Sequence, residues 1–393
     1  MKYRRFGRTN LQMPVFSTGG MRYQHKWQDV PWNEVPAEGQ ANLEATIHRS
    51  MELGINHIET ARHYGSSEMQ LGPVLKQLPR EKLILQTKVP PTSTAREFMA
   101  MFETSMRYLG MDYVDLLSLH GINNAELLDW ALQKNGCLSA IRQLQREGRV
   151  RSVGFSTHAT TDIIIKAIQS NEFDYVNLHW YFVNHFTWPA VQAAAARDMG
   201  VFIISPNDKG GKLYLDLPIM RELCAPLTPM QFNDLYCLSR PEVHTLSIGA
   251  ARPEDYDEHI AGLEQYDRAA EVTAPAEKRL RDRMDEILGA DWCARWPEGL
   301  PEYNDSPNQV NIVEILRLYT YAKPLGLGEW AKFRYNMLGT AEHWFPGEHV
   351  GKLDNVATRK ALAKSPFANR IIEILDEAHE LYFAAPVKRL SQS

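Results

Sequence analysis

Residues 82–120, KLILQTKVPPTSTAREFMAMFETSMRYLGMDYVDLLSLH, contain one complete strand–helix–strand unit. The apolar runs 82–89 and 113–120 have the length and composition of buried strands. Between them, residues 94–109 have the pattern of an amphipathic helix, and Gly110 supplies a typical helix end. A helix-length connection between two strands favours parallel pairing. This stretch therefore predicts a parallel β-sheet with helices between its strands.

The same alternation runs through the first two thirds of the chain. Six further apolar runs indicate strands, at 15–20, 55–59, 149–156, 173–180, 201–206 and 244–250, and helix-like stretches lie at 39–53, 125–147, 159–170 and 187–199. Eight strands within about 250 residues favour a (β/α)8 TIM barrel over an open doubly wound sheet. No GxGxxG motif follows the first strand, and SPNDKGGKL (205–213) is not a complete P-loop.

The composition changes after about residue 265. Residues 265–290 are charged and helix-like, 291–307 are rich in Trp and Pro and predict a loop, and helices are expected at 308–323, 328–340 and 366–383. We therefore predict a barrel over residues 1–265 and a helical extension over 266–393.

Charge and cysteine content exclude several classes of protein. A net charge of -5 gives no basic surface for nucleic acid, and no segment is apolar enough for a signal peptide or a membrane span. No CxxC, HxxxH or HExxH spacing indicates a metal site. The four cysteines are far apart, as expected of reduced thiols, so we predict a cytoplasmic protein whose partner is a small molecule: Cys137, Cys224, Cys237 and Cys293.

Polar side chains follow three successive predicted strands: Glu59 with Tyr64 close behind it, Lys88, and His120. Each alone is ordinary at a strand end. In a βα barrel, however, the carboxyl ends of the strands face a common cup where reactions occur, so the four groups are candidates for one catalytic site.

These four groups suit proton transfer. A phenol with a pKa near 10 is a weak acid at neutral pH, and a nearby ammonium lowers that pKa by favouring the phenolate. Lys88 is placed to supply the charge, Glu59 to hold Lys88, and His120 to orient a substrate oxygen. Tyr64 would then be a general acid directed at a carbonyl oxygen.

Over residues 1–265 the sequence resembles the aldo-keto reductases. IETARHYGSSEMQLG (58–72) is similar to their second-strand signature, LQTKV (85–89) carries their lysine and DYVDLLSLHG (112–121) their histidine. The N-terminal MKYRRFGRTNLQM is similar to their opening hairpin. The resemblance implies that the barrel binds NADP(H) in extended form, without a Rossmann domain, and transfers hydride to or from a carbonyl.

The resemblance also implies the cofactor contacts. GRVRSVGFSTH (148–158) matches the element that holds the nicotinamide carboxamide, and SIGAARPEDYDEHI (247–260) resembles the segment that binds adenosine and the 2′-phosphate, with Arg252 as the expected phosphate contact. An ordinary surface arginine at a helix start remains the alternative for Arg252. The residues expected to bind the cofactor are Gly20, Met21, Ser156, Thr157, Asn177, Ser205, Asn207, Gly249, Ala250, Arg252, Asp255 and His259.

Four positions depart from the family pattern. Glu59 stands in place of the usual aspartate, Thr157 in place of asparagine, Asn177 in place of glutamine and His259 in place of asparagine. These substitutions bear on cofactor affinity and catalytic rate more than on the identity of the cofactor.

Aromatic residues follow two strands on the same rim. The loop 21–36 contains Trp27 and Trp32, and HWYFVNHFTW (179–188) contains Trp180. They are either packing residues of the rim or aromatic walls of a substrate pocket.

The extension resembles a degenerate ferredoxin-like domain. SPNQVNIVEILRLYTYAK (306–323) is similar to the stretch after the last cluster cysteine, but Ser306 stands where that cysteine would be. An iron–sulfur cluster needs about four cysteine ligands, and only Cys293 is near in sequence. We therefore expect no cluster.

Together these features predict an NADPH-dependent oxidoreductase that reduces an aldehyde, ketone or sugar carbonyl. The alternative is a regulatory or scaffold protein that keeps the barrel and binds the cofactor with little turnover.

Overall fold

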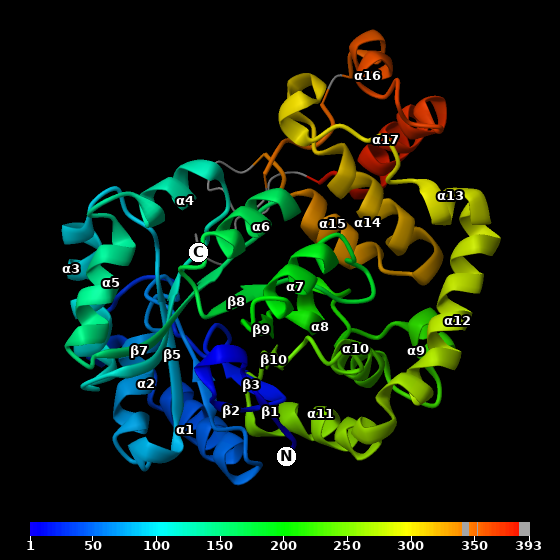
Figure 1. The fold of residues 1–393 in the computed structure, drawn as a ribbon. Helices are drawn as coiled ribbons and strands as arrows, with labels where there is room; N and C mark the ends of the chain where they lie inside the picture. Colours follow the sequence, from blue (N-terminus) through cyan, green and yellow to red (C-terminus); the bar gives the residue numbers. More distant parts are fainter. Residues whose placement is uncertain (340–345, 352, 385–393) are drawn as a thin grey trace.

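The computed structural model describes residues 1–339, 346–351 and 353–384. Eight parallel strands form a closed barrel in the order β10-β3-β4-β5-β6-β7-β8-β9 (Figure 1). The predicted (β/α)8 barrel is therefore confirmed, and every predicted strand is present. The strands are β3 (Phe16–Gly19), β4 (His57–Glu59), β5 (Ile84–Val89), β6 (Val114–Leu119), β7 (Val150–Ser156), β8 (Tyr175–Leu178), β9 (Gly200–Ile203) and β10 (Thr245–Ile248).

An antiparallel hairpin of β1 (Tyr3–Arg5) and β2 (Gln12–Pro14) precedes the barrel. Its Phe6 and Met13 are fully buried and belong to one apolar cluster with Ile84 and Tyr175, the first residues of β5 and β8. The hairpin therefore closes the amino-terminal end of the barrel, and the opposite end carries the candidate site.

Helices cover the outside of the barrel. The prediction of one helix over 125–147 was wrong: Asn135 has a left-handed backbone (φ 68°) that divides it into α4 and α5. The helices that surround the barrel are α1 (Ala37–Glu52), α2 (Ser67–Leu75), α3 (Ala95–Leu109), α4 (Ala125–Leu132), α5 (Cys137–Arg146), α6 (Thr161–Gln169), α7 (Trp188–Ala195), α8 (Pro206–Lys209), α9 (Pro218–Cys224), α10 (Pro229–Leu238) and α11 (Asp257–Gly262).

The extension adds a second group of helices that shares its apolar core with the barrel. Helix α12 packs on α9 and α10 of the barrel and on α14 of the extension (Figure 1). None of the helices in the described residues is both long and apolar enough to cross a membrane. The extension contains α12 (Ala269–Leu288), α13 (Ala290–Arg295), α14 (Ile312–Leu325), α15 (Gly328–Tyr335), α16 (Asn355–Ala361) and α17 (Ala368–Tyr382).

The predicted loop over 291–307 was only partly correct, because its first residues form α13. Trp292 is buried there and donates a hydrogen bond from Nε1 to Thr320 Oγ1 (3.1 Å), so it anchors a helix rather than a loop. The chain-breaking residues Pro297 and Gly299 come after that helix ends. Helix α16 was not predicted.

A chain of hydrogen bonds crosses the barrel interior below the candidate site. Its members come from six strands and are all fully buried, with contacts of 2.6–3.0 Å: Thr245, Ser17, His57, Gln86, Ser118 and Tyr175. Burial lowers the pKa of His57 to about 3, so the imidazole is neutral in the folded protein.

This depressed pKa predicts a loss of stability in acid. The unfolded state binds a proton on His57 near pH 6.5, whereas the folded state does not until about pH 3, so stability falls as pH drops through that interval. At pH 5 the expected contribution is about 2 kcal/mol. Between pH 7.5 and pH 5, the free energy of unfolding in denaturant should fall less in His57→Gln than in the unchanged protein. The two falls should differ by about 2 kcal/mol. Equal falls in both proteins would contradict this assignment.

Candidate active site

The ends of β4, β5 and β6 bring the four predicted catalytic side chains together. Glu59 is the last residue of β4, Lys88 lies in β5 and His120 follows β6, while Tyr64 lies in the turn after β4. Lys88 Nζ forms an ion pair with the Glu59 carboxylate, donates to the Thr60 carbonyl (3.0 Å) and lies 3.3 Å from the Tyr64 hydroxyl. The ion pair is buried, so it holds the ammonium against the phenol in a site with little water.

Burial and the ammonium act in opposite directions on Tyr64. Burial raises the pKa of the phenol above its usual value near 10, and Lys88 lowers it without cancelling that rise. The net lowering expected from the sequence is therefore absent, although Lys88 acts in the predicted direction. At neutral pH the phenol is protonated, which is the form that a proton donor requires.

Lys88 remains charged in this site. Burial alone would lower the pKa of its ammonium, but Glu59 and Tyr64 outweigh that effect and raise the pKa above its usual value. The lysine therefore provides a permanent positive charge beside the phenol.

His120 lies edge-to-face against Tyr64, with ring centroids 5.5 Å apart. Burial lowers the pKa of His120 well below its usual value, and the positive charge of Lys88 adds to that effect. The ring is therefore neutral at pH 7, which suits a hydrogen-bonding group better than a cation. Trp27 also lies edge-to-face against Tyr64, with ring centroids 6.4 Å apart, so the loop after β3 packs against the phenol.

The turn that carries Tyr64 is fixed by a buried ionic network that sequence reasoning missed. Arg62 forms ion pairs with Glu68 and with Asp29 of the preceding loop, and Glu68 also accepts a hydrogen bond from Thr87 (2.6 Å). The signal was present, since Arg62 and Glu68 flank the tyrosine in sequence. This network joins both loops around the phenol.

Gly65, directly after Tyr64, has a left-handed backbone (φ 53°). A Cβ atom there would lie 2.0 Å from the Lys26 carbonyl oxygen and within 2.5 Å of the Trp27 backbone. Only glycine lets the two loops approach this closely.

Two further contacts fix Glu59. Its carboxylate accepts a hydrogen bond from Ser247 Oγ of β10 (3.2 Å), and its carbonyl accepts one from Gly20 N (2.7 Å). Ser247 was not predicted, although it lies one residue before the end of β10. The carboxylate is thereby held by side chains of β5 and β10.

The expected nicotinamide site has a buried amide that suits a ligand. Asn177 of β8 is fully buried, and neither polar atom of its side chain has a hydrogen-bond partner among the described residues. Ser156 pairs with Asn177 in the barrel register, and its hydroxyl accepts from Gly121 N (3.0 Å), which leaves its proton for another acceptor. Burying an amide without a hydrogen-bond partner costs about 1–3 kcal/mol of stability. A carboxamide group has both a donor and an acceptor, so it would form hydrogen bonds with both polar atoms of Asn177. The residues present therefore fit the nicotinamide carboxamide.

Thr157 forms its hydrogen bonds with the backbone of neighbouring loops. Its hydroxyl donates to the Ile122 carbonyl (2.7 Å) and accepts from Ala159 N (2.9 Å). The side chain that stands in place of asparagine therefore stabilises its own loop.

The other expected cofactor residues lie along the same end of the barrel. Asn207 of α8 is buried, and its Oδ1 has no partner among the described residues, while Ser205 begins that helix with a left-handed backbone (φ 51°). Asp255 accepts hydrogen bonds from Ala251 N (2.8 Å) and Arg252 Nε (3.0 Å). The Arg252 guanidinium is exposed, as a contact for a surface phosphate requires. Met21 is half-buried, Gly249 is exposed and Ala250 is buried.

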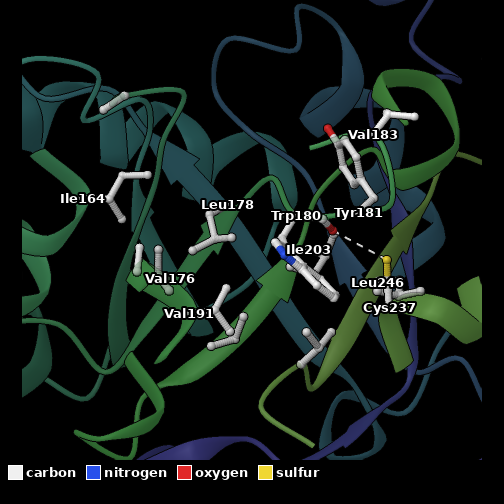
Figure 2. Close-up of a cluster of buried hydrophobic side chains, with 14 of the residues drawn as sticks. Ile164, Val176, Leu178, Trp180, Tyr181, Val183, Val191, Ile203, Cys237 and Leu246 are labelled. Atoms are coloured by element: carbon white, nitrogen blue, oxygen red, sulfur yellow. Dashed lines mark hydrogen bonds between the residues drawn. The ribbon is translucent and has the colours of Figure 1, made fainter. Parts of the chain in front are cut away.

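Three predicted residues are not brought to the site. Trp180 is 3% exposed and stacks on Tyr236 in the apolar core, with its carbonyl accepting from Cys237 Sγ (Figure 2). His259 is buried against Asp234, to which its Nδ1 is hydrogen bonded. Trp32 is 49% exposed in a short 3-10 turn, Trp32–Glu34. Trp180 and His259 are therefore buried, whereas Trp32 is exposed on the loop after β3.

The closed barrel and the strand-end site define a protein of the (β/α)8 class. A model of the Aldo/keto reductase family matches residues 16–206, from β3 to the start of α8, so this part of the chain is similar to that family. The holo form of an aldo-keto reductase from Bacillus halodurans has the same fold, with a TM-score of 0.60, 20% identity and coverage of 71% of this chain and 96% of that one.

Two curated relatives extend the comparison. L-galactose dehydrogenase of Arabidopsis thaliana is 33% identical over 121 residues, 28% of this chain and 37% of that protein. A putative voltage-gated potassium channel subunit beta of Schizosaccharomyces pombe is 22% identical over 349 residues, 73% of this chain and 93% of that protein. The chain spans less than half the length of the curated relatives that it matches at 30% identity or more.

Proposed function

We propose that this protein is an NADPH-dependent oxidoreductase that reduces an aldehyde, ketone or sugar carbonyl to an alcohol. The observation that carries the proposal is the buried contact of Lys88 with both Glu59 and the Tyr64 hydroxyl. The unpartnered amide of Asn177 supports a nicotinamide cofactor, and the plant relative named for a sugar substrate supports a sugar carbonyl.

Each residue then has a defined part in the reaction. NADPH, when bound, supplies the hydride. Tyr64 donates the phenolic proton to the carbonyl oxygen, and Lys88 stabilises the phenolate that remains. The neutral His120 donates a hydrogen bond that orients the same oxygen, and Glu59 fixes Lys88 in place. Asn177 and Ser156 hold the carboxamide of the cofactor.

The second candidate function is cofactor-dependent regulation with little turnover, which the similarity to a potassium channel beta subunit favours. Steady-state oxidation of NADPH with a panel of aldehydes, ketones and sugars separates the two functions. Turnover with saturable kinetics supports the oxidoreductase. Tight NADPH binding without turnover of any carbonyl would refute the oxidoreductase function and support the regulatory one.

Arg252→Ala tests the choice of cofactor. The exposed guanidinium is expected to bind the 2′-phosphate, so the variant should lose about 10- to 100-fold in NADPH affinity and keep its NADH affinity. Fluorescence titration with both cofactors measures this difference. The matched control is Arg268→Ala, which removes another exposed arginine of the same chain. An equal loss of affinity for NADPH and for NADH would show that Arg252 does not bind the 2′-phosphate.

A further inference from the structure

The loop between β3 and α1, residues 21–36, packs against the turn that carries Tyr64. We call that turn, residues 60–66 between β4 and α2, the catalytic turn. The Ser66 amide donates to the Lys26 carbonyl (3.0 Å), and the Ser66 hydroxyl accepts from the His25 amide (3.0 Å). The loop and the catalytic turn are therefore joined through their backbones.

The side chain of Arg62 lies across the catalytic turn. The Arg62 amide donates to the Lys88 carbonyl (2.9 Å), which fixes the turn to the strand of the catalytic lysine. The Arg62 guanidinium forms a buried ion pair with Glu68 through Nη1, and its Nη2 lies 3.5 Å from the Gly65 carbonyl oxygen. One side chain therefore links the residues on both sides of Tyr64.

Asp29 of the loop 21–36 forms the second ion pair of this guanidinium, with the same Nη2 that faces Gly65. The Asp29 side chain is 45% exposed, whereas the side chains of Arg62 and Glu68 are 9% and 0% exposed. Asp29 can therefore be changed at the surface while the buried ion pair beneath it stays complete.

The two carboxylates contribute differently to the Arg62 contact. Burial raises the pKa of the Glu68 carboxyl, and the charge of Arg62 opposes that effect. The half-exposed Asp29 keeps its charge at a lower cost, because water still solvates it. The guanidinium also packs on the Tyr108 ring, 4.9 Å from its centroid. Of these partners, Asp29 is the one that comes from the loop 21–36.

We propose that Asp29 is a positioning residue for the proton donor, acting through Arg62 on the turn that carries Tyr64. This inference rests on the proposed carbonyl reduction, and it gives the loop 21–36 a part in the chemical step. The Asp29 carboxylate holds Nη2 beside the Gly65 carbonyl. Without that carboxylate, the direction of Nη2 is no longer fixed, and the phenol moves over a wider range of positions. A displacement of about 1 Å near a reacting group costs up to about 100-fold in rate.

The test is Asp29→Asn, which removes the charge and keeps the size of the side chain. We expect kcat for one good carbonyl substrate to fall about 10-fold, because the substitution alters the geometry of proton transfer. KM and NADPH affinity should change by less than about twofold. The melting temperature should stay within about 3 °C of wild type, because the ion pair reaches the surface. Asp29→Glu keeps the carboxylate and should retain most of kcat.

The matched control is Glu34→Gln. Glu34 lies on the same loop, is 47% exposed and forms an ion pair with Lys26 (3.2 Å), so it matches Asp29 in charge and exposure. It should keep the kcat of wild type. Wild-type kcat in Asp29→Asn, or an equal fall of kcat in both variants, would overturn the inference. A fall of kcat that only follows a loss of folded protein would also overturn it.

Arg62 itself is not substituted, because its removal would leave the buried Glu68 without a counter-charge and endanger the fold.

Amide hydrogen exchange separates this inference from the proposed reaction, because it needs no substrate. Asp29→Asn should speed exchange in the catalytic turn as well as in the loop 21–36. Faster exchange of the turn would support the contact even if wild type reduced no carbonyl, in which case the proposed reaction alone would fail. Unchanged exchange of the turn in Asp29→Asn, with a wild type that reduces carbonyls, would refute the positioning role alone.

Discussion

Tyr64→Phe is expected to lower kcat/KM for carbonyl reduction by about 10²–10⁴-fold, the usual contribution of a general acid. The substitution removes only the hydroxyl that lies 3.3 Å from Lys88 Nζ and leaves the ring packed against His120 and Trp27. Because the ring remains, NADPH affinity should stay near wild type. The measurements are steady-state kinetics with one good carbonyl substrate and a fluorescence titration of NADPH.

The matched control is Tyr23→Phe. Tyr23 has a buried hydroxyl that lies beside Gly20, on the same end of the barrel, and it is not part of the proposed proton transfer. It should keep most of the activity. Wild-type kcat/KM in Tyr64→Phe, under conditions where chemistry limits the rate, would show that another group donates the proton.

Lys88→Met is expected to have two large effects. Carbonyl reduction should fall by about 10²–10⁴-fold, because the phenolate formed at Tyr64 loses the adjacent positive charge. Stability should fall by about 3–5 kcal/mol, because the buried Glu59 carboxylate loses its ion-pair partner. The measurements are kcat/KM and the free energy of unfolding in denaturant.

The double variant Lys88→Met with Glu59→Gln separates these effects. A neutral amide at position 59 removes the uncompensated charge, so most of the lost stability should return while activity stays low. Recovery of both stability and activity would mean that Lys88 serves the fold rather than the reaction.

The convergence of the site was predictable from the sequence because it follows from strand order alone. Glu59, Lys88 and His120 lie at or next to the carboxyl ends of successive strands, and neighbouring parallel strands place these ends together. The placement of Trp180 was not predictable in this way. It lies beyond the end of β8, and its ring stacks on Tyr236, a residue 56 positions away in the chain.

Other features depend on contacts between distant parts of the chain. Trp330 meets Lys209 across 121 residues, and Arg317 meets Val183 across 134. No local pattern shows that α14 and α15 pack on the barrel rim. The pKa of Tyr64 was also beyond sequence reasoning, because its direction depends on how completely the phenol is buried.

The continuous apolar core that joins the barrel to the extension has a consequence for the evolution of this chain. A module that folds separately can be lost or exchanged between proteins as a unit. Here, removal of α14 and α15 would expose the fully buried Trp330 and strip the rim loops of their hydrogen-bond partners. Inheritance of the two parts is therefore coupled, and loss of the extension alone would leave an apolar surface and unpaired backbone groups on the barrel.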